Sequence, residues 1–287
     1  MKQIAPNVYI ATDCGPITVG AVLTDAGWVC IDAPPRPRDA LGWLAALQEV
    51  RAAPICYLIN TDAHRDRVVG NAWFNAPVIA HQAAAAQMTA LGSSYIAQAA
   101  EELSENGHEM MQMASLKPVA PQITFSQALT LYCGERAIEL TSKPSATLGS
   151  LWVVLKEEKV IFSGDSVIVG QHPYISDRAS KAWLETLRLL RLSRHSNWTI
   201  VPGRGEVCAP SDTAPLAEYL RMARRRIASL IRAGGQRSEV GQLIPELLDF
   251  FPYPASARDQ VQRRIKAGLE AIYDEMRAAG DSDIEDA

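Results

Sequence analysis

The stretch Asn60–Arg67, with the sequence Asn-Thr-Asp-Ala-His-Arg-Asp-Arg, decides the fold of this chain. It follows an apolar run whose composition predicts a buried strand, so its polar side chains come at a strand end. Asp62, His64 and Asp66 are residue types that ligate metal ions, whereas Arg67 has no lone pair to offer a metal. The stretch therefore sets metal-ligand side chains beside a cation in one loop.

Three further loops follow predicted strands downstream, namely Pro144–Ser150, Ser163–Asp165 and Pro202–Gly205. Helical spacing of apolar residues predicts helices at 39–50 and 177–194. Elements in the order strands, helix, strands, helix, strand are typical of a layered α/β sandwich.

The four loops, taken in this order, resemble the metallo-β-lactamase superfamily of hydrolases. That family carries a T-H-x-H-x-D-H loop after a strand, then an H-T-P-G-S loop, a strand ending in G-D, and a P-G-H-G turn. Val29–Asp32 also resembles its V-x-I-D strand, and Val78–His81 resembles its V-I-A-H segment. The resemblance implies an αββα sandwich with a helical insertion and a C-terminal helical extension. It also implies two divalent metal ions, typically zinc, which generate a hydroxide and polarise the substrate.

Matched one by one, the metal-ligand positions implied by the resemblance hold Asp62, His64, Asp66, Arg67, Ala146, Asp165 and Arg204. Three of them keep the family's ligand, and Asp62 replaces a histidine by a residue that still ligates. Arg67, Ala146 and Arg204 replace the other three histidines, and none of these side chains can bind a metal. Of the five histidines in the chain, only His64 stands at a ligand position. We therefore expect no dinuclear centre and no cofactor.

The charges of these seven cleft candidates suggest what replaces the metals. Asp62, Asp66 and Asp165 bring three negative charges, and buried carboxylates without partners are costly. Arg67 and Arg204 bring two positive charges, so the hypothesis is that their guanidinium groups stand where the metal ions stood. On this hypothesis the cleft binds a small anionic molecule, and its catalytic residues, if any, are unknown.

Three alternatives stay open at this point. The first is a hydrolase of thioesters, lactones or phosphodiesters with a single weakly bound manganese, iron or zinc on Asp62, His64, Asp66 and Asp165. The second is a regulatory or interaction protein that uses the insertion or the C-terminal helices. The third is loss of function by drift, with both arginines directed to solvent. Whether the chain is an enzyme is therefore uncertain.

The pattern along the 287 residues predicts one metallo-β-lactamase-like domain at 1–235, with a Met-rich helical insertion at 81–118. C-terminal helices at 236–280 would pack on this domain, and an acidic tail follows at 281–287. The insertion offers a surface on which two copies of the chain could pair. Whether a homodimer forms stays open.

Composition excludes several classes of protein. The net charge of −4 gives no reason to expect nucleic acid as a partner. No apolar run is long enough for a membrane helix, so no membrane partner is expected. Five cysteines, an odd number without a Cys-x-x-Cys pair, favour a reducing cytoplasm over a disulfide framework.

Overall fold

The computed structural model describes residues 1–92 and 94–280. By their contacts, the residues form two compact units. The first unit comprises Met1–Ser142 and Gly149–Gly164, and the second comprises Lys143–Leu148 and Asp165–Ala287. The acidic tail predicted at 281–287 lies outside the described residues. This division does not test the domain boundaries expected from the sequence, which stay predictions.

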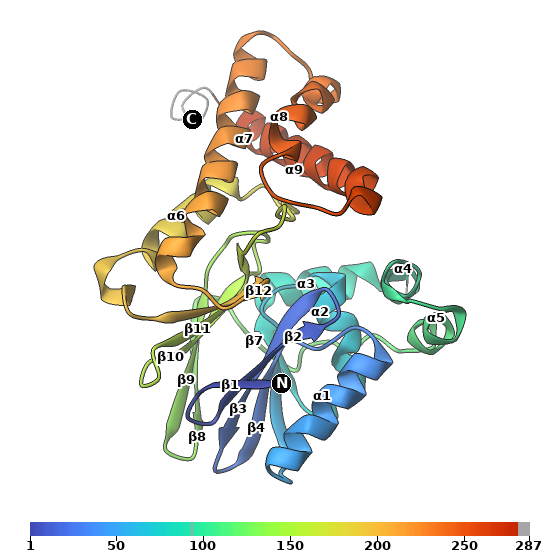
Figure 1. Cartoon of the computed structure of the whole chain (residues 1–287), viewed down its shortest axis with the longest axis vertical. Helices are drawn as coiled ribbons and strands as arrows, with labels where there is room; N and C mark the ends of the chain where they lie inside the picture. The colour runs from blue at the N-terminus through green and yellow to red at the C-terminus, as the bar shows by residue number, and fades with distance from the viewer. Residues whose placement is uncertain (93, 281–287) are drawn as a thin grey trace. The chain divides into compact units, whose positions relative to one another are not determined.

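A seven-stranded sheet forms one layer of the first unit. Its strands, in spatial order, are β1 (Lys2–Ala5), β2 (Val8–Cys14), β3 (Ile17–Thr24), β4 (Gly27–Ile31), β5 (Ile55–Ile59), β6 (Val78–His81) and β7 (Ile123–Phe125). The first four pair antiparallel, and the last three add in parallel. Parallel neighbours need a crossover, which α1 (Pro37–Val50) supplies between β4 and β5. Its buried Ala40, Trp43 and Leu47 share one helical face, and Figure 1 shows α1 alongside this sheet.

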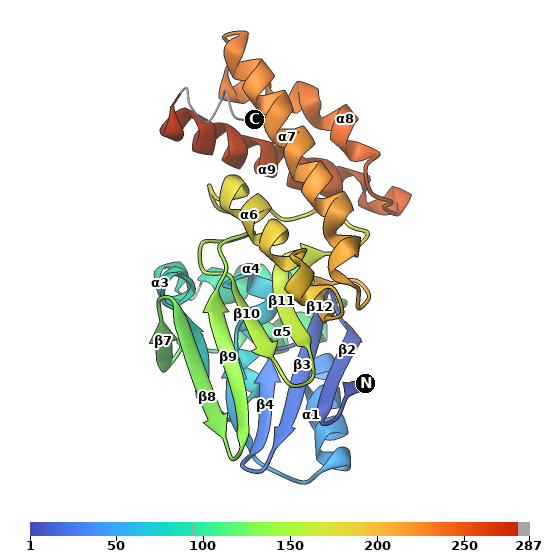
Figure 2. The same cartoon turned by 90° about the vertical axis from the view of Figure 1, so that its left-hand side faces the viewer.

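The second sheet contains five strands. In spatial order they are β12 (Thr199–Arg204), β11 (Val160–Ile168), β10 (Leu151–Leu155), β9 (Arg136–Ser142) and β8 (Ala128–Cys133). Within the first unit the two sheets stack face to face, with β8 to β10 in front of β3 and β4 in Figure 2. Gly20 of β3 permits this close approach, because a Cβ there would lie 2.2 Å from the ring of Phe162 in β11. The sandwich expected from the sequence is confirmed.

The insertion after β6 is helical, as expected. It contains α3 (Gln82–Leu91), α4 (Ser94–Leu103) and α5 (Gly107–Ala114). The short α2 (Arg65–Val68) begins in the loop at Asn60–Arg67, called the motif loop below, and precedes β6. Met88 and Met113 pack in a buried cluster with Ala63 and Tyr95, whereas Met111 is exposed. The insertion is thus joined to the motif loop through a common apolar core.

The second unit carries α6 (Ser180–Leu190), α7 (Ala214–Arg232), α8 (Ile244–Leu248) and α9 (Arg258–Ala279). Helix α9 packs against α7 and α8, which supplies the expected C-terminal helical extension (Figure 2). Arg224 of α7 is buried and donates to Ser180 Oγ at 2.8 Å. No described helix is both long enough and apolar enough to cross a membrane.

The helix predicted at 177–194 is shorter than expected. It begins at Ser180, because the Asp177 carboxylate accepts the backbone N–H of Leu148 at 2.7 Å and does not cap the helix. The carboxylate of Glu275 in α9 caps it instead, accepting the backbone N–H groups of Ser180 and Lys181 at 2.8 and 3.0 Å. The helix start is therefore set by a tertiary contact.

Candidate functional site

Asp32 ties the motif loop of the first unit to the end of β4. Its backbone takes the left-handed conformation at φ 58°, and its side chain is buried. One carboxylate oxygen accepts the N–H of Thr61 at 2.8 Å and the other accepts the Thr61 hydroxyl at 2.7 Å. Burial raises the pKa of Asp32 to about 6, while the Arg67 guanidinium and the Thr61 hydrogen bonds act to lower it. The loop is thus anchored by a carboxylate that is costly to ionise.

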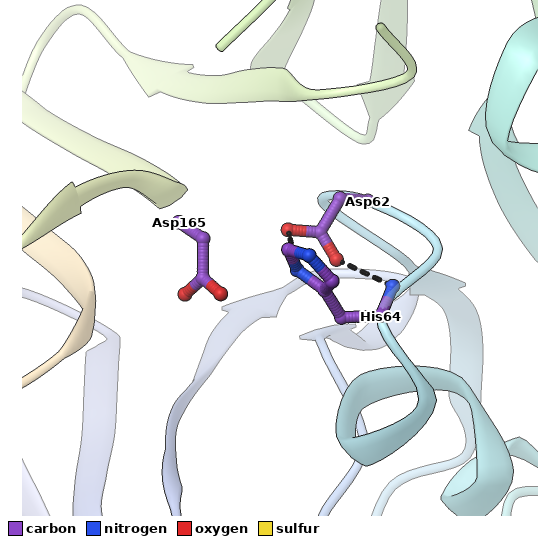
Figure 3. Close-up of side chains that lie close together, drawn as sticks. All are labelled: Asp62, His64 and Asp165. Carbon is purple, nitrogen blue, oxygen red and sulfur yellow. Dashed lines mark hydrogen bonds and ion pairs between the residues drawn. The ribbon is translucent and has the colours of Figure 1, made fainter. Parts of the chain in front are cut away.

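Asp62 and His64 form a tight pair within that loop (Figure 3). Asp62 Oδ1 accepts the backbone N–H of His64 at 2.9 Å, and Asp62 Oδ2 lies 3.2 Å from His64 Nδ1. The Asp62 side chain is fully buried, and His64 is 13% exposed. Asp66 lies in the first turn of α2 and is also buried.

Arg67 directs its guanidinium into the protein. Its side chain is 0% exposed, with Nη1 2.7 Å from Asp32 Oδ2 and Nε 3.5 Å from Asp62 Oδ2. The interpretation that this arginine points at solvent is therefore wrong. Its partner Asp32 was not among the residues expected at the site, although the V-x-I-D strand that ends at Asp32 was a signal for it.

In the second unit, Asp165 lies in β11 and Arg204 at the end of β12. Arg204 donates through both Nε and Nη2 to Asp165 Oδ2, at 3.1 and 3.0 Å. The side chains are 3% and 0% exposed, so Arg204 does not point at solvent either. Ala146 is buried in the same unit, where its carbonyl accepts the N–H of Ser176 at 3.2 Å. The expected arginine–aspartate contact is present in this unit.

Three residues that sequence reasoning missed hold these groups in place. Tyr95 of α4 donates its hydroxyl to the Ala63 carbonyl at 2.8 Å, which joins the insertion to the motif loop. Burial raises the pKa of Tyr95, so its hydroxyl stays a donor at neutral pH. In the second unit, the guanidinium carbons of Arg204 and Arg264 lie 4.7 and 3.7 Å from the ring centroid of Tyr174. Nothing in the local sequence marks these long-range partners.

The histidines outside the ligand positions have structural surroundings. His81 Nδ1 accepts the N–H of Ala83 at 3.2 Å and so caps α3. His172 is buried against the ring of Phe251, with Nε2 3.1 Å from the Leu248 carbonyl, and burial lowers its pKa. His108 is exposed, and His195 stacks edge-on with Trp198.

Comparisons with known proteins agree with this fold. The chain resembles a metallo-beta-lactamase family protein from Thermus thermophilus, with a TM-score of 0.67 and 14% identity over 95% of each chain. It resembles a beta-lactamase domain protein from Burkholderia ambifaria, with a TM-score of 0.68 and 12% identity over 97% of this chain and 88% of that one. It also resembles the sec-alkylsulfatase Pisa1 from Pseudomonas sp., with a TM-score of 0.67 and 14% identity over 97% of this chain and 51% of that one.

Identities this low show the fold alone. No curated protein matches the chain. A family model described as the metallo-beta-lactamase superfamily matches residues 12–204, about two thirds of the sequence. The chain belongs to the metallo-beta-lactamase superfamily.

Proposed function

We propose that this chain is a metal-independent member of its superfamily that binds a small anionic molecule, with guanidinium groups in place of the metal charge. The observation that carries the proposal is the contact between Arg204 and Asp165. Two guanidinium nitrogens of Arg204 share one carboxylate oxygen of the fully buried Asp165, at 3.1 and 3.0 Å. The resemblance implies that this carboxylate bridges two metal ions in the family, whereas here it holds a cation of the protein itself.

The residues present do not fit a dinuclear metal centre. Asp62 and Asp165, both retained as potential ligands, each have a guanidinium within 3.5 Å. A divalent ion at either carboxylate would have to displace that cation or bear its repulsion. Loss of one residue beyond the ligand shell already lowers metal affinity about 10–100-fold, and here Arg67, Ala146 and Arg204 replace ligands themselves. The substitutions therefore favour a site without two metals.

An anion is the ligand class that the remaining chemistry favours. The guanidinium group is a planar fork of donors that matches the geometry of carboxylates and phosphates. Arg204 is held from two directions, by the Asp165 carboxylate and by the Tyr174 ring. A fixed guanidinium loses little conformational freedom when it binds an anion.

The test of anion binding uses inorganic phosphate and acetate as probes. We expect phosphate to raise the melting temperature of the wild-type protein in a concentration-dependent manner, because a ligand of the folded state stabilises it. In Arg204→Gln this shift should be lost, whereas Arg188→Gln, which changes an exposed arginine of α6, should keep it. No shift with either probe in the wild type, or an equal shift in Arg204→Gln, would refute anion binding at this residue.

Hydrolysis at a single metal ion is the competing function. Asp62, His64 and Asp165 each offer one atom that can ligate a metal (Figure 3). That function requires manganese, iron or zinc to stimulate hydrolysis of an activated ester or phosphodiester, and Asp165→Ala to abolish the stimulated rate. Our proposal requires that no added metal raises the hydrolysis rate of the wild type above the rate of Asp165→Ala. Circular dichroism of the variant would establish that it is folded.

Three expectations from the sequence stay predictions: a cytoplasmic location, no nucleic-acid partner and no membrane partner. Whether the chain forms a homodimer stays an open question. A role in protein contacts through the insertion also stays an alternative. If that alternative holds, neither phosphate nor acetate would bind to this chain. The chain would instead bind a protein partner, and the binding would depend on exposed residues such as Met111.

A further inference from the structure

Helix α7 of the second unit carries a groove lined by arginines. The groove has a volume of about 480 Å³, and its lining residues are Met222, Arg225, Arg226, Ser229 and Arg232. Apart from the adjacent arginines, these positions are three or four residues apart, so they share one face of the helix. The groove therefore offers three guanidinium groups, one hydroxyl and one thioether, and among the described residues no carboxylate lines it.

The ion pairs that these arginines already make are weak. Arg225 Nη2 lies 2.9 Å from Glu218 Oε1, and Arg226 Nε lies 2.6 Å from Glu246 Oε2. All four side chains are between 41% and 53% exposed. Exposed pairs of this kind contribute about 0–1 kcal/mol, so either guanidinium can pair with another carboxylate at little cost. Arg232, in the last turn of α7, makes no ion pair with another residue in the part of the chain that the structure describes.

The segment 281–287 is complementary to this groove in its chemistry. Its sequence, Asp-Ser-Asp-Ile-Glu-Asp-Ala, brings four carboxylates within seven residues and one large apolar side chain, Ile284. In an extended chain Asp281, Asp283 and Glu285 would share one side and span about 13 Å. The helical rise from Arg225 to Arg232 is about 10 Å. Carboxylates on one side of the segment can therefore cover the length of the arginine groove.

Helix α9 brings the start of this segment close to α7. Arg224 Nη1 lies 3.3 Å from Glu275 Oε1, and the Tyr273 hydroxyl donates to the Gly235 carbonyl at 3.1 Å. Figure 2 shows α9 crossing α7. From Glu275 to Gly280 the helical rise adds about 8 Å, whereas seven extended residues span up to about 25 Å. The segment is therefore long enough to reach the groove of its own chain.

We propose that the acidic segment 281–287 docks in the arginine groove of α7 in the same chain. Its carboxylates pair with Arg225, Arg226 and Arg232, and Ile284 lies on Met222. The docked segment neutralises the groove, so any other acidic ligand has to compete with it for these guanidinium groups. This inference goes beyond the anion binding proposed for Arg204 and does not rest on it.

The experiment is nuclear magnetic resonance relaxation of the full chain, which gives backbone order parameters for 282–286. In the wild type at low salt we expect values above about 0.6, the limit below which a backbone counts as flexible. The variant that combines Arg225→Gln, Arg226→Gln and Arg232→Gln should bring them below about 0.6. Sodium chloride at about 1 M should do the same in the wild type, because salt screens exposed charges.

The matched control is Arg258→Gln, which removes another exposed arginine of the same unit. Arg258 begins α9, so the helix places it about 33 Å from Gly280, beyond the reach of the segment. The order parameters of 282–286 should therefore be the same in this variant as in the wild type. An equal loss of order in Arg258→Gln would refute docking at the groove, because the effect would follow total charge alone.

Three results would overturn the proposal. Order parameters below about 0.6 in the wild type at low salt would leave the groove to an acidic ligand from outside the chain. Equal order in the wild type and the triple variant would place the segment elsewhere. Order that appears only at high protein concentration would place it in the groove of a second copy.

A second measurement locates the segment without removing charge. Arg232→Lys keeps the cation, and a carbodiimide should join its new amine to a carboxylate of 281–287 in an amide bond. Mass spectrometry of the digested chain would identify the cross-linked peptide. Arg258→Lys should give no such cross-link. Absence of the cross-link in Arg232→Lys would overturn the proposal even if the triple variant did not fold.

Discussion

Replacing Arg67 by methionine tests the buried charge cluster of the first unit. The Arg67→Met variant keeps most of the apolar stem but removes the guanidinium, which lies 2.7 Å from Asp32 Oδ2 and 3.5 Å from Asp62 Oδ2. Both carboxylates are almost fully buried. Breaking a buried ion pair by removing one partner costs about 3–5 kcal/mol, because the other charge is left uncompensated. We expect a loss of this size in the free energy of unfolding at pH 8.

The pH dependence of the loss identifies its cause. The pKa of Asp32 in the folded protein is about 6, above its ordinary value of 3.8. The folded protein therefore binds this proton more tightly than the unfolded protein does. As the pH rises from about 4 to about 6, Asp32 lowers the free energy of unfolding by about 3 kcal/mol in total. Without Arg67 the pKa of Asp32 rises further, so the free energy of unfolding continues to fall above pH 6. The cost of Arg67→Met should therefore be greater at pH 8 than at pH 5, by at least about 1.4 kcal/mol, which corresponds to one pKa unit.

The assay is urea unfolding followed by circular dichroism at pH 5 and pH 8. Arg65→Met is the matched control on the same short helix, since Arg65 is 33% exposed and pairs with the exposed Glu102. It should cost less than about 1 kcal/mol at either pH. Equal losses for Arg67→Met at the two pH values, or a loss no larger than that of the control, would refute the charge cluster as the reason for the burial of Arg67.

Three further predictions concern the supports of the site. Tyr95→Phe should lower the free energy of unfolding by about 1–3 kcal/mol in urea, because the Ala63 carbonyl loses its hydroxyl donor; an unchanged value would contradict that contact. Gly164→Ala should cost about 2 kcal/mol or more in the same assay, since φ is 53° and the new Cβ would lie 2.4 Å from Thr61 Oγ1; a neutral effect would mean that β11 relaxes freely at this position. His172 has a pKa lowered by burial, so the unfolded chain takes up its proton first and stability is lost as the pH falls below about 6.5. The His172→Phe variant should lose less stability than the wild type between pH 7.5 and pH 5.5, and an identical loss would contradict this role.

The sandwich could be predicted because its signals are local. Apolar runs bounded by turns predict strands wherever they occur, and each motif loop follows one of them directly. The ligand positions that the resemblance implies are predictions from motifs in which neighbouring residues match the family, as at Arg204 between Gly203 and Gly205. The two edge strands of the seven-stranded sheet, β1 and β7, were not predicted from the sequence. Strand β7, at Ile123–Phe125, has only three residues, too few to show alternation.

The partners of the site residues could not be predicted, because they depend on tertiary geometry. Asp32 contacts Arg67 across 35 positions of sequence, and its backbone takes the left-handed conformation directly after β4. The start of α6 depends on Glu275, 95 positions away from Ser180. The Tyr174 ring gathers arginines from β12 and α9, and neither segment carries a motif that announces the contact.

The metal content of the purified protein tests the central claim most directly. The measurement is the number of zinc, iron and manganese ions per chain, by mass spectrometry of protein dialysed after exposure to each metal. The variant that combines Arg67→His, Ala146→His and Arg204→His serves as the positive control, because it restores three ligands and removes both cations. We predict less than about a tenth of an equivalent in the wild type and about one equivalent or more in this variant. One or more equivalents retained by the wild type would contradict the account.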